Sequence, residues 1–264
     1  MKSNFTETNK SLKFLILPIK NPSEELFKII NYFHKKLNII VIDDGSKINT
    51  HFFKGINKKV LLIRNKKNMG KGFSIKKAFW LILLKKNVSG AIIADSDGQH
   101  AINDIEKIYK FFSKNPLKFT IGQRKFKLLK TPFRNYIGNL ISSFIFLIRF
   151  KIYIDTQCGL RGIPIKYIKK SLRIDANDYS FELGQLIDLI LNDRDNLKFI
   201  TIKTIYKKKI KSYFNPILDS ISIMKQFQKW QYHLYYYLIY KFYFFLVFYI
   251  VHIKKDSIYF RLFL

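Results

Sequence analysis

Short apolar runs alternate with longer amphipathic segments through the first half of the chain, and this alternation limits the fold more than any other feature. Five runs predict buried strands, at 13–17, 38–43, 59–64, 90–95 and 118–122. Three segments between them predict helices, at 23–36, 73–86 and 103–114. Strands alternating with helices of this length are typical of a mostly parallel, doubly wound sheet. We therefore expect an α/β, Rossmann-like domain whose sheet is sandwiched by helices.

Two acidic clusters follow predicted strands. "VIDDGS" (41–46) ends the second strand and "ADSDG" (94–98) ends the fourth. Ligands of doubly wound sheets bind beyond the carboxyl ends of the strands. Both clusters therefore fall where a ligand site is expected.

Composition sets the class of protein but does not choose its partner. The chain has 264 residues, 48% of them hydrophobic, which is enough for one sizeable globular core. The net charge of +30 would attract nucleic acid, anionic lipid or phosphorylated substrates. Part of that charge also has a plain source, since lysine is one of several abundant residues with AT-rich codons. We do not expect nucleic acid as the partner, because acidic clusters at strand ends repel phosphate unless a metal lies between them.

A single cysteine, Cys158, excludes an intrachain disulfide and a cysteine-based zinc site. We expect it to be a small buried residue. The early apolar run "FLILPI" (14–19) is too short for the core of a signal peptide and leads into Lys20 without a cleavage site. No cleaved leader is therefore expected.

The aspartates of "ADSDGQH" are two residues apart. In an extended segment such residues point the same way, so Asp95 and Asp97 can present both carboxylates to one cation. Oxygen ligands favour Mg²⁺ or Mn²⁺ over Zn²⁺. The alternative is a solvated turn that caps the helix after it. His100 is expected to be a hydrogen-bonded structural residue.

Two further loops carry polar groups suited to a nucleotide. An aspartate in "VIDDGS" can accept a hydrogen bond from a base or a ribose hydroxyl, although an ordinary Asp-Gly turn is the alternative. In "RNKKNMGKG" (64–72), Gly70 and Gly72 with Lys67 and Lys71 open a helix, where a diphosphate would be favoured. The spacing of a P-loop is absent.

The second half of the chain is less regular. Residues 131–150 predict a helix with a long apolar face, too short to span a bilayer and suited to a core or an interface. A tail from about Trp230 is almost wholly apolar and aromatic. We expect a catalytic domain over 1–225 and a membrane-associating, apolar helical tail over 226–264.

Five motifs occur in an order that resembles family 2 glycosyltransferases with a GT-A fold, in the polyprenyl- or dolichyl-phosphate mannosyl- and glucosyltransferase-like branch. They are "VIDDGS", "NMGKG", "ADSDGQH" with "NDI", "DTQCGLRG" and "SYFNPILDS", within about residues 12–222. The chain departs from the family pattern in two places. "PIKNP" (18–22) has Lys20 and Pro22 where an aromatic and an acidic residue are usual, and "AIND" replaces the proline that usually follows Gln-His.

The resemblance implies a nucleotide-sugar donor and a Mg²⁺ or Mn²⁺ ion that bridges its diphosphate to the protein. Asp97 would be the main metal ligand, with Asp95 beside it on the metal or the ribose. The other implied donor contacts are at the nucleoside (Asp43 and Asp44), beside the base (Pro18 and Asn21), and in the loop after the third strand (Asn68, Gly70 and Lys71).

The resemblance also implies an inverting, metal-dependent hexosyltransferase that uses a UDP-glucose or GDP-mannose type donor. Its acceptor would be lipid-linked, with polyprenyl phosphate first. Lys71, Arg124 and Arg134 are candidates to neutralise phosphates, and Asp155, Gln157 and Arg161 fall in the acceptor-facing segment. Glu182 would orient groups for a phosphate acceptor. For the alternative, a hydroxyl acceptor in cell-surface glycan synthesis, it would be the general base.

The tail leaves the mode of membrane attachment open. Leu234 to Val251 gives 18 residues interrupted only by Lys241. A central lysine costs about 2.5–3.5 kcal/mol on an insertion scale, which roughly cancels the gain from the aliphatic residues and phenylalanines. A spanning helix and a helix lying in the interface both remain open. We expect a peripheral or C-terminally anchored protein at the cytoplasmic face of the membrane. A non-catalytic relative is the further alternative, because "PIKNP" could mark loss of activity.

Overall fold

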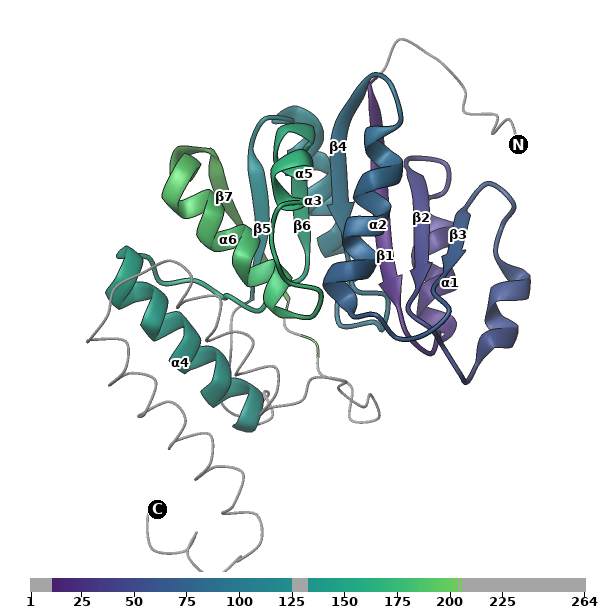
Figure 1. Cartoon of the computed structure of the whole chain (residues 1–264), viewed down its shortest axis with the longest axis horizontal. Coiled ribbons are helices and arrows are strands. Elements are labelled where there is room, and N and C mark those ends of the chain that lie inside the picture. Colours follow the sequence, from purple (N-terminus) through teal and green to yellow (C-terminus); the bar gives the residue numbers. More distant parts are fainter. Residues whose placement is uncertain (1–10, 125–132, 204, 206–264) are drawn as a thin grey trace, which may run out of the picture.

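The computed structural model of the chain describes residues 11–124, 133–203 and 205, without the side chains of 133–138, 141 and 145. One seven-stranded sheet, in the order β3-β2-β1-β4-β6-β5-β7, runs through it (Figure 1). Its strands are β1 (Leu12–Ile19), β2 (Asn38–Asp43), β3 (Leu61–Arg64), β4 (Val88–Ile93), β5 (Phe119–Arg124), β6 (Arg161–Pro164) and β7 (Leu197–Ile202). Only β6 is antiparallel to its described neighbours, β4 and β5.

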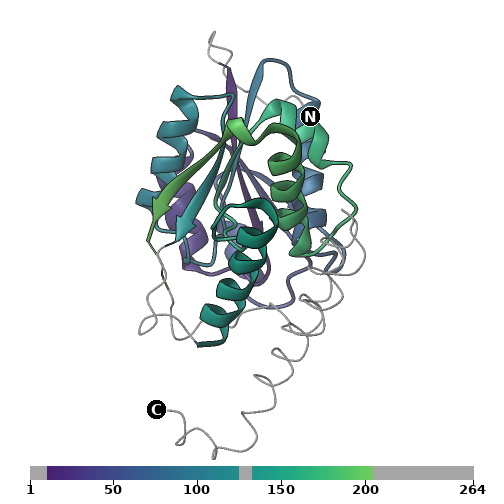
Figure 2. The same ribbon diagram turned by 90° about the vertical axis from the view of Figure 1, so that its left-hand side faces the viewer.

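Helices cover both faces of the sheet. One face carries α1 (Glu24–Phe33) and α3 (Ile102–Lys114), and the other carries α2 (Lys71–Leu83), α5 (Ile165–Ser171) and α6 (Ser180–Asp193) (Figures 1 and 2). Helix α4 (Phe133–Phe150) lies beyond the carboxyl ends of β5 and β7 in both views. Short 3-10 helices at Thr50–Gly55 and Arg194–Asn196 complete the described elements.

The predicted α/β class is confirmed, and so is the mostly parallel sheet. All five predicted strands and all four predicted helices form, with ends displaced by a few residues. The sequence pattern did not anticipate β6, α5, α6 and β7 individually. Strand β6 has only four residues and all of them are buried, so its sequence shows no alternation of apolar and polar residues.

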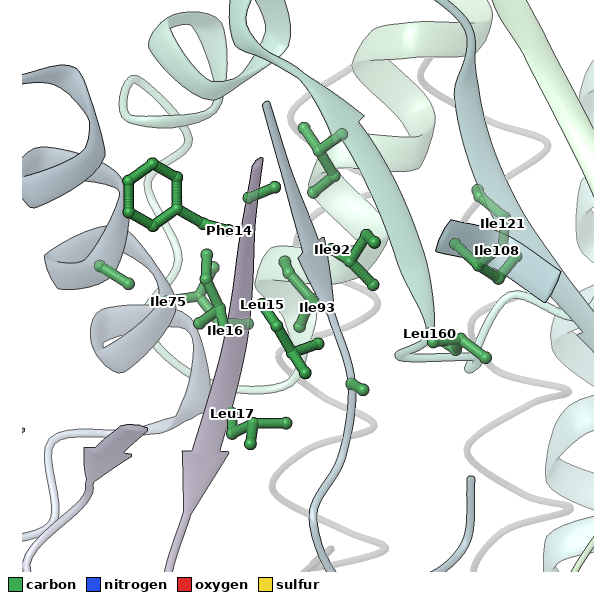
Figure 3. Close-up of a cluster of buried hydrophobic side chains, with 14 of the residues drawn as sticks. Phe14, Leu15, Ile16, Leu17, Ile75, Ile92, Ile93, Ile108, Ile121 and Leu160 are labelled. Atoms are coloured by element: carbon green, nitrogen blue, oxygen red, sulfur yellow. The ribbon is translucent and has the colours of Figure 1, made fainter. Parts of the chain in front are cut away.

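The apolar runs that were predicted as buried strands form the hydrophobic core. Leu15, Ile16 and Leu17 of β1 are fully buried because both faces of a central parallel strand are covered. Figure 3 shows this cluster where β1 and β4 lie side by side, with Ile75 from α2 against it. Burial on both sides explains the continuous hydrophobic runs.

The sheet changes winding direction between β1 and β4. From β1 the chain builds outward through β2 and β3, whereas β4 pairs on the other side of β1. The loops after β1 and β4 meet there, with Ala94 N donating to Ile16 O at 3.1 Å and Ser96 Oγ donating to Pro18 O at 3.3 Å. Ligand sites of open α/β sheets lie at such a switch point.

The predicted tail, 226–264, lies outside the described residues, so the domain boundary near residue 225 stays a prediction. Within the described ranges, no helix is both long enough and apolar enough to cross a membrane. The predicted helix over 131–150 forms as α4, from Phe133.

Candidate active site

Asp95 follows β4 at the switch point and is held by a lysine from a different loop. Lys71, the first residue of α2, places Nζ 2.6 Å from Asp95 Oδ1. On its other side, the backbone N–H of Asp95 donates to Nδ1 of the buried His100 at 3.0 Å. His100 therefore has the predicted structural hydrogen bond.

The same lysine reaches a second carboxylate. Lys71 Nζ lies 3.1 Å from each oxygen of Glu182, in the first turn of α6. Burial opposes the charge on Lys71, but the two carboxylates outweigh it and raise the pKa of the ammonium. Burial also opposes the charge on Asp95, yet Lys71 and then His100 lower the pKa of that carboxyl to about 2. We name Asp95, Lys71 and Glu182 the ionic trio.

Gly159 packs directly against the ionic trio. A Cβ at this glycine would lie 2.7 Å from Lys71 Nζ, 2.8 Å from Asp95 Oδ2 and 3.0 Å from Glu182 Oε1. These distances are shorter than ordinary carbon contacts, so any larger residue would push the charged groups apart. The glycine of "DTQCG" is thus a close-approach position.

Asp97 is oriented by its own loop. Its Oδ1 accepts from Gln99 N and its Oδ2 from Gln99 Nε2, both at 2.9 Å. Burial, followed by the charge of Asp95, raises the pKa of Asp97. Two crowded carboxylates are an arrangement that a divalent cation would relieve.

The oxygen donors of Asp95 and Asp97 fit Mg²⁺ or Mn²⁺, which prefer carboxylates. Nowhere in the described ranges do three His, Cys, Asp or Glu side chains gather as a complete metal cage. A cation at this pair would therefore complete its coordination with substrate or water oxygens, which is usual for Mg²⁺ sites that bind phosphates.

The carboxylate of Asp44 accepts hydrogen bonds from the loop that follows β3. Oδ1 accepts from Asn65 Nδ2 at 2.9 Å and from Met69 N at 2.8 Å, while Oδ2 accepts from Gly70 N at 2.9 Å. The side-chain amide of the exposed Asn68 lies between Asp44 and Lys20. "VIDDGS" thus fixes the shape of "NMGKG".

Asp43 is buried and paired with Arg64, whose Nε donates to its Oδ2 at 2.6 Å. Its Oδ1 accepts from Ser46 N at 2.9 Å, and Ser46 Oγ also donates to it. Asn21, in a left-handed conformation with φ 56°, donates its N–H to Ser46 Oγ at 2.7 Å. The predicted nucleoside residues therefore lie in adjoining loops, with Pro18 buried behind them.

The glycines of "NMGKG" serve close packing within the chain. A Cβ at Gly70, whose φ is +100°, would lie 2.2 Å from Asn177 O, and one at Gly72 would lie 2.6 Å from Phe181 Cβ. Phe73 N donates to Asn177 O at 2.9 Å. The start of α2, where a diphosphate was predicted, is thus covered here by the segment that leads into α6.

Asp155 forms a second centre beside the first. Its Oδ2 accepts from Arg124 Nε at 2.5 Å, and its Oδ1 accepts from Arg124 Nη2 at 3.0 Å, Asn139 Nδ2 at 2.6 Å and Gln157 N at 3.1 Å. The carboxylate ties β5, α4 and the "DTQCG" loop together. At least two N–H donors of Arg124 are therefore used in hydrogen bonds to Asp155. The side chain of Arg134 lies outside the described part of the chain.

Arg161 is fully buried at the start of β6. Its Nε donates to Cys158 O at 3.2 Å and its Nη1 to the backbone oxygen of Glu182 at 2.5 Å. Within the described structure Nη2 has no hydrogen-bond partner. Arg161 thus contacts the backbone of Glu182 and stabilises the first turn of α6.

Several residues of the site had not been assigned a role from the sequence, among them Gln99, Asn139, Gly159 and Arg64. Gln99 could have been found, because an aspartate in a turn commonly accepts a hydrogen bond from the backbone N–H two residues later. The others meet their partners only through the fold, since Arg64 is 21 residues from Asp43 and Asn139 is 16 residues from Asp155.

Comparison with known proteins decides the family. The family model for glycosyl transferase family 2 matches residues 23–169, more than half of the chain. The chain is a family 2 glycosyltransferase. This confirms the predicted family and enzyme class. A relative from Methanococcus voltae, UDP-N-acetylglucosamine–dolichyl-phosphate N-acetylglucosaminyltransferase, is 30% identical over 226 residues, which cover 74% of this chain and 86% of that protein.

Solved structures agree with the GT-A fold of this family 2 glycosyltransferase. Glucosyl-3-phosphoglycerate synthase from Mycobacterium tuberculosis, in complex with Mn²⁺, UDP-glucose and phosphoglyceric acid, superposes with a TM-score of 0.61 at 13% identity over 82% of this chain and 79% of that one. Mannosyl-3-phosphoglycerate synthase from Rubrobacter xylanophilus gives 0.61 at 12% identity, covering 83% and 73%. At such identities the likeness establishes the fold alone.

Proposed function

We propose that this glycosyltransferase moves a sugar from a nucleotide-sugar donor to a lipid-linked acceptor, with polyprenyl phosphate as the first candidate. The observation that carries the proposal is the ionic trio, which joins a donor-side carboxylate, Asp95, to Glu182 on the acceptor side. The Methanococcus voltae relative, named for a dolichyl-phosphate acceptor, supports the lipid. UDP-glucose and GDP-mannose are the proposed donor types, and that relative adds UDP-N-acetylglucosamine to the donors to be tested.

Asp97 and Asp95 are proposed to hold a Mg²⁺ or Mn²⁺ ion. When bound, the ion would stabilise the negative charge of the departing nucleoside diphosphate. The chain's own part is to keep the carboxylates ready: Lys71 holds Asp95 in its ionised form, and Gln99 fixes both oxygens of Asp97. This arrangement requires little reorganisation when the donor arrives.

The state of Glu182 favours a phosphate acceptor. Its side chain is only 7% exposed and both oxygens face Lys71, so the carboxylate is placed to orient the ammonium. A phosphate monoester is already an anionic nucleophile and needs no base. Arg124, beside Asp155, is proposed to attract that phosphate with Arg134, and Gln157 to line the same acceptor segment.

A hydroxyl acceptor is the second candidate. In the described structure Glu182 Oε1 has no hydrogen-bond partner beyond the nearby ammonium. This oxygen could take a proton if the segment around Gly159 moved to admit an alcohol. The enzyme would then act on a saccharide in cell-surface glycan synthesis.

The deciding experiment incubates the full chain with polyprenyl phosphate and labelled UDP-glucose, GDP-mannose or UDP-N-acetylglucosamine, with and without Mn²⁺. We expect transfer with one donor, dependent on the metal and lost in Asp97→Asn. Glu182→Gln should weaken phosphate transfer but abolish hydroxyl transfer. The proposal fails if no donor reacts and no nucleotide binds in the presence of Mn²⁺.

The proposed site of action is the cytoplasmic face of the membrane, because nucleotide sugars are cytoplasmic and the acceptor is a lipid. The tail over 226–264 is proposed to provide attachment, peripheral or spanning. Fractionation of cells that express the full chain and a chain ending at 225 tests this, since loss of the membrane-bound pool on truncation is expected.

A further inference from the structure

Helix α4 turns large apolar side chains toward solvent. Leu140, Phe144 and Leu147 are 40%, 56% and 39% exposed. Their spacing of four and three residues places them on one face of the helix. We name these three residues the outer face of α4. Exposed apolar groups that adjoin one another form a patch, the kind of surface by which proteins bind membranes or partners.

Hydrogen bonds fix the opposite side of α4. Asn139 Nδ2 donates to Asp155 Oδ1 at 2.6 Å, and Ser143 Oγ donates to Ile154 O at 2.5 Å. Ser142 Oγ accepts from Thr156 Oγ1 at 2.8 Å. All three of these helix residues are buried, so rotating the outer face inward would strand their polar groups. The exposure of the apolar residues is thus built into the fold.

The charges near the outer face favour a lipid surface as its occupant. Arg149 is exposed in the last turn of α4, and Lys151 is exposed directly after the helix ends at Phe150. Cations at the end of an apolar helical face suit anionic headgroups. A second copy of this chain would bring another +30 of net charge against the first, which disfavours self-association.

We propose that the outer face of α4 inserts into the headgroup region of an anionic membrane. The helix has 18 residues and would lie along the surface. Because Asn139 on its inner side is bonded to Asp155, which holds Arg124, the contact would bring the acceptor side of the site to the bilayer. Only this last consequence rests on the proposed function; the surface itself does not.

The test places a fluorophore on the outer face. Phe144→Cys in the full chain is labelled with an environment-sensitive dye, and Leu84→Cys, directly after α2 and 77% exposed in the parent, is the matched control. The unsubstituted chain, whose Cys158 is buried, checks for background labelling. Vesicles of phosphatidylcholine mixed with phosphatidylglycerol are added, with or without brominated acyl chains.

We expect a blue shift and quenching by brominated lipid for the dye at position 144, and neither for the dye at position 84. The proposal is overturned if the dye at 144 stays in water while the protein sediments with vesicles. It is also overturned if that dye is shielded from water before lipid is added. Shielding that does not depend on protein concentration would mean that residues 206–264 cover the outer face, and shielding that does would mean that a second copy covers it.

A substitution pair gives a second readout. Phe144→Asp should weaken vesicle binding about tenfold, since it puts a charge where an apolar group inserts. Leu84→Asp should leave binding unchanged, and equal binding by both variants would contradict the inference. Neither measurement uses transfer activity, so a failed transfer assay would leave this result standing.

Discussion

Lys71 Nζ lies 2.6 Å from Asp95 Oδ1, and the same ammonium also contacts Glu182, 111 residues further along the chain. One cation thereby faces two carboxylates from different parts of the fold, the buried Glu182 and the half-buried Asp95. Removing it would leave like charges facing each other in a region with little water.

Lys71→Met should lower the free energy of unfolding by about 3–5 kcal/mol, the usual cost of leaving a buried charge unpaired. Urea denaturation measures this. Lys66→Met, at an exposed position in the same loop, should change stability little. Adding Glu182→Gln to Lys71→Met should restore part of the loss, because one of the stranded charges is then removed. Equal unfolding midpoints for Lys71→Met and the parent chain would contradict the ion-pair argument.

Gly159→Ala should lower nucleotide-sugar affinity in the presence of Mn²⁺ by about tenfold or more, because a methyl group would intrude on all three groups of the ionic trio. Titration calorimetry with the donor measures it. Gly162→Ala is the matched control, since its Cβ would come no closer than 3.3 Å to any neighbour. If both variants bind the donor like the parent, the close packing at Gly159 has no bearing on the site.

Asp44→Ala should loosen the "NMGKG" loop, because Asn65, Met69 and Gly70 would all lose the acceptor of a hydrogen bond. We expect a destabilisation of about 1–3 kcal/mol, with faster hydrogen exchange at the Met69 and Gly70 amides. Lys47→Ala, exposed in the turn after β2, serves as control. Unchanged exchange at both amides would show that Asp44 does not hold the loop.

The thiol of Cys158 should resist alkylation in the folded protein. Burial, with the charge of Asp155, raises the pKa of this thiol to about 12, and its side chain is inaccessible. At pH 8 iodoacetamide should modify it only after unfolding, when its pKa returns to about 8.5. Between the unfolded pKa of about 8.5 and the folded pKa of about 12, only the folded chain keeps the thiol proton. The free energy of unfolding therefore falls as the pH rises through this range. Mass spectrometry of native and urea-treated samples measures the labelling, and rapid labelling of the native chain would contradict the burial.

The sequence by itself determined the class of the fold and the position of its main loops. The period of the apolar residues and the lengths of the segments are local properties, so β1 to β5 and α1 to α4 could be predicted before any contact was known. The order of the motifs along the chain is likewise a property of the sequence alone, so the resemblance to the family could be stated without the structure.

Tertiary structure alone decided how the charges of the site are used. Asp44 bonds to its own loop, Arg161 is buried behind Glu182, and Lys71 is shared between two carboxylates. None of these pairings has a local signal, because the partners come from separate elements and meet only when the sheet and its helices pack. A charged residue taken out of water must find a partner, and which partner lies within reach is set by the fold.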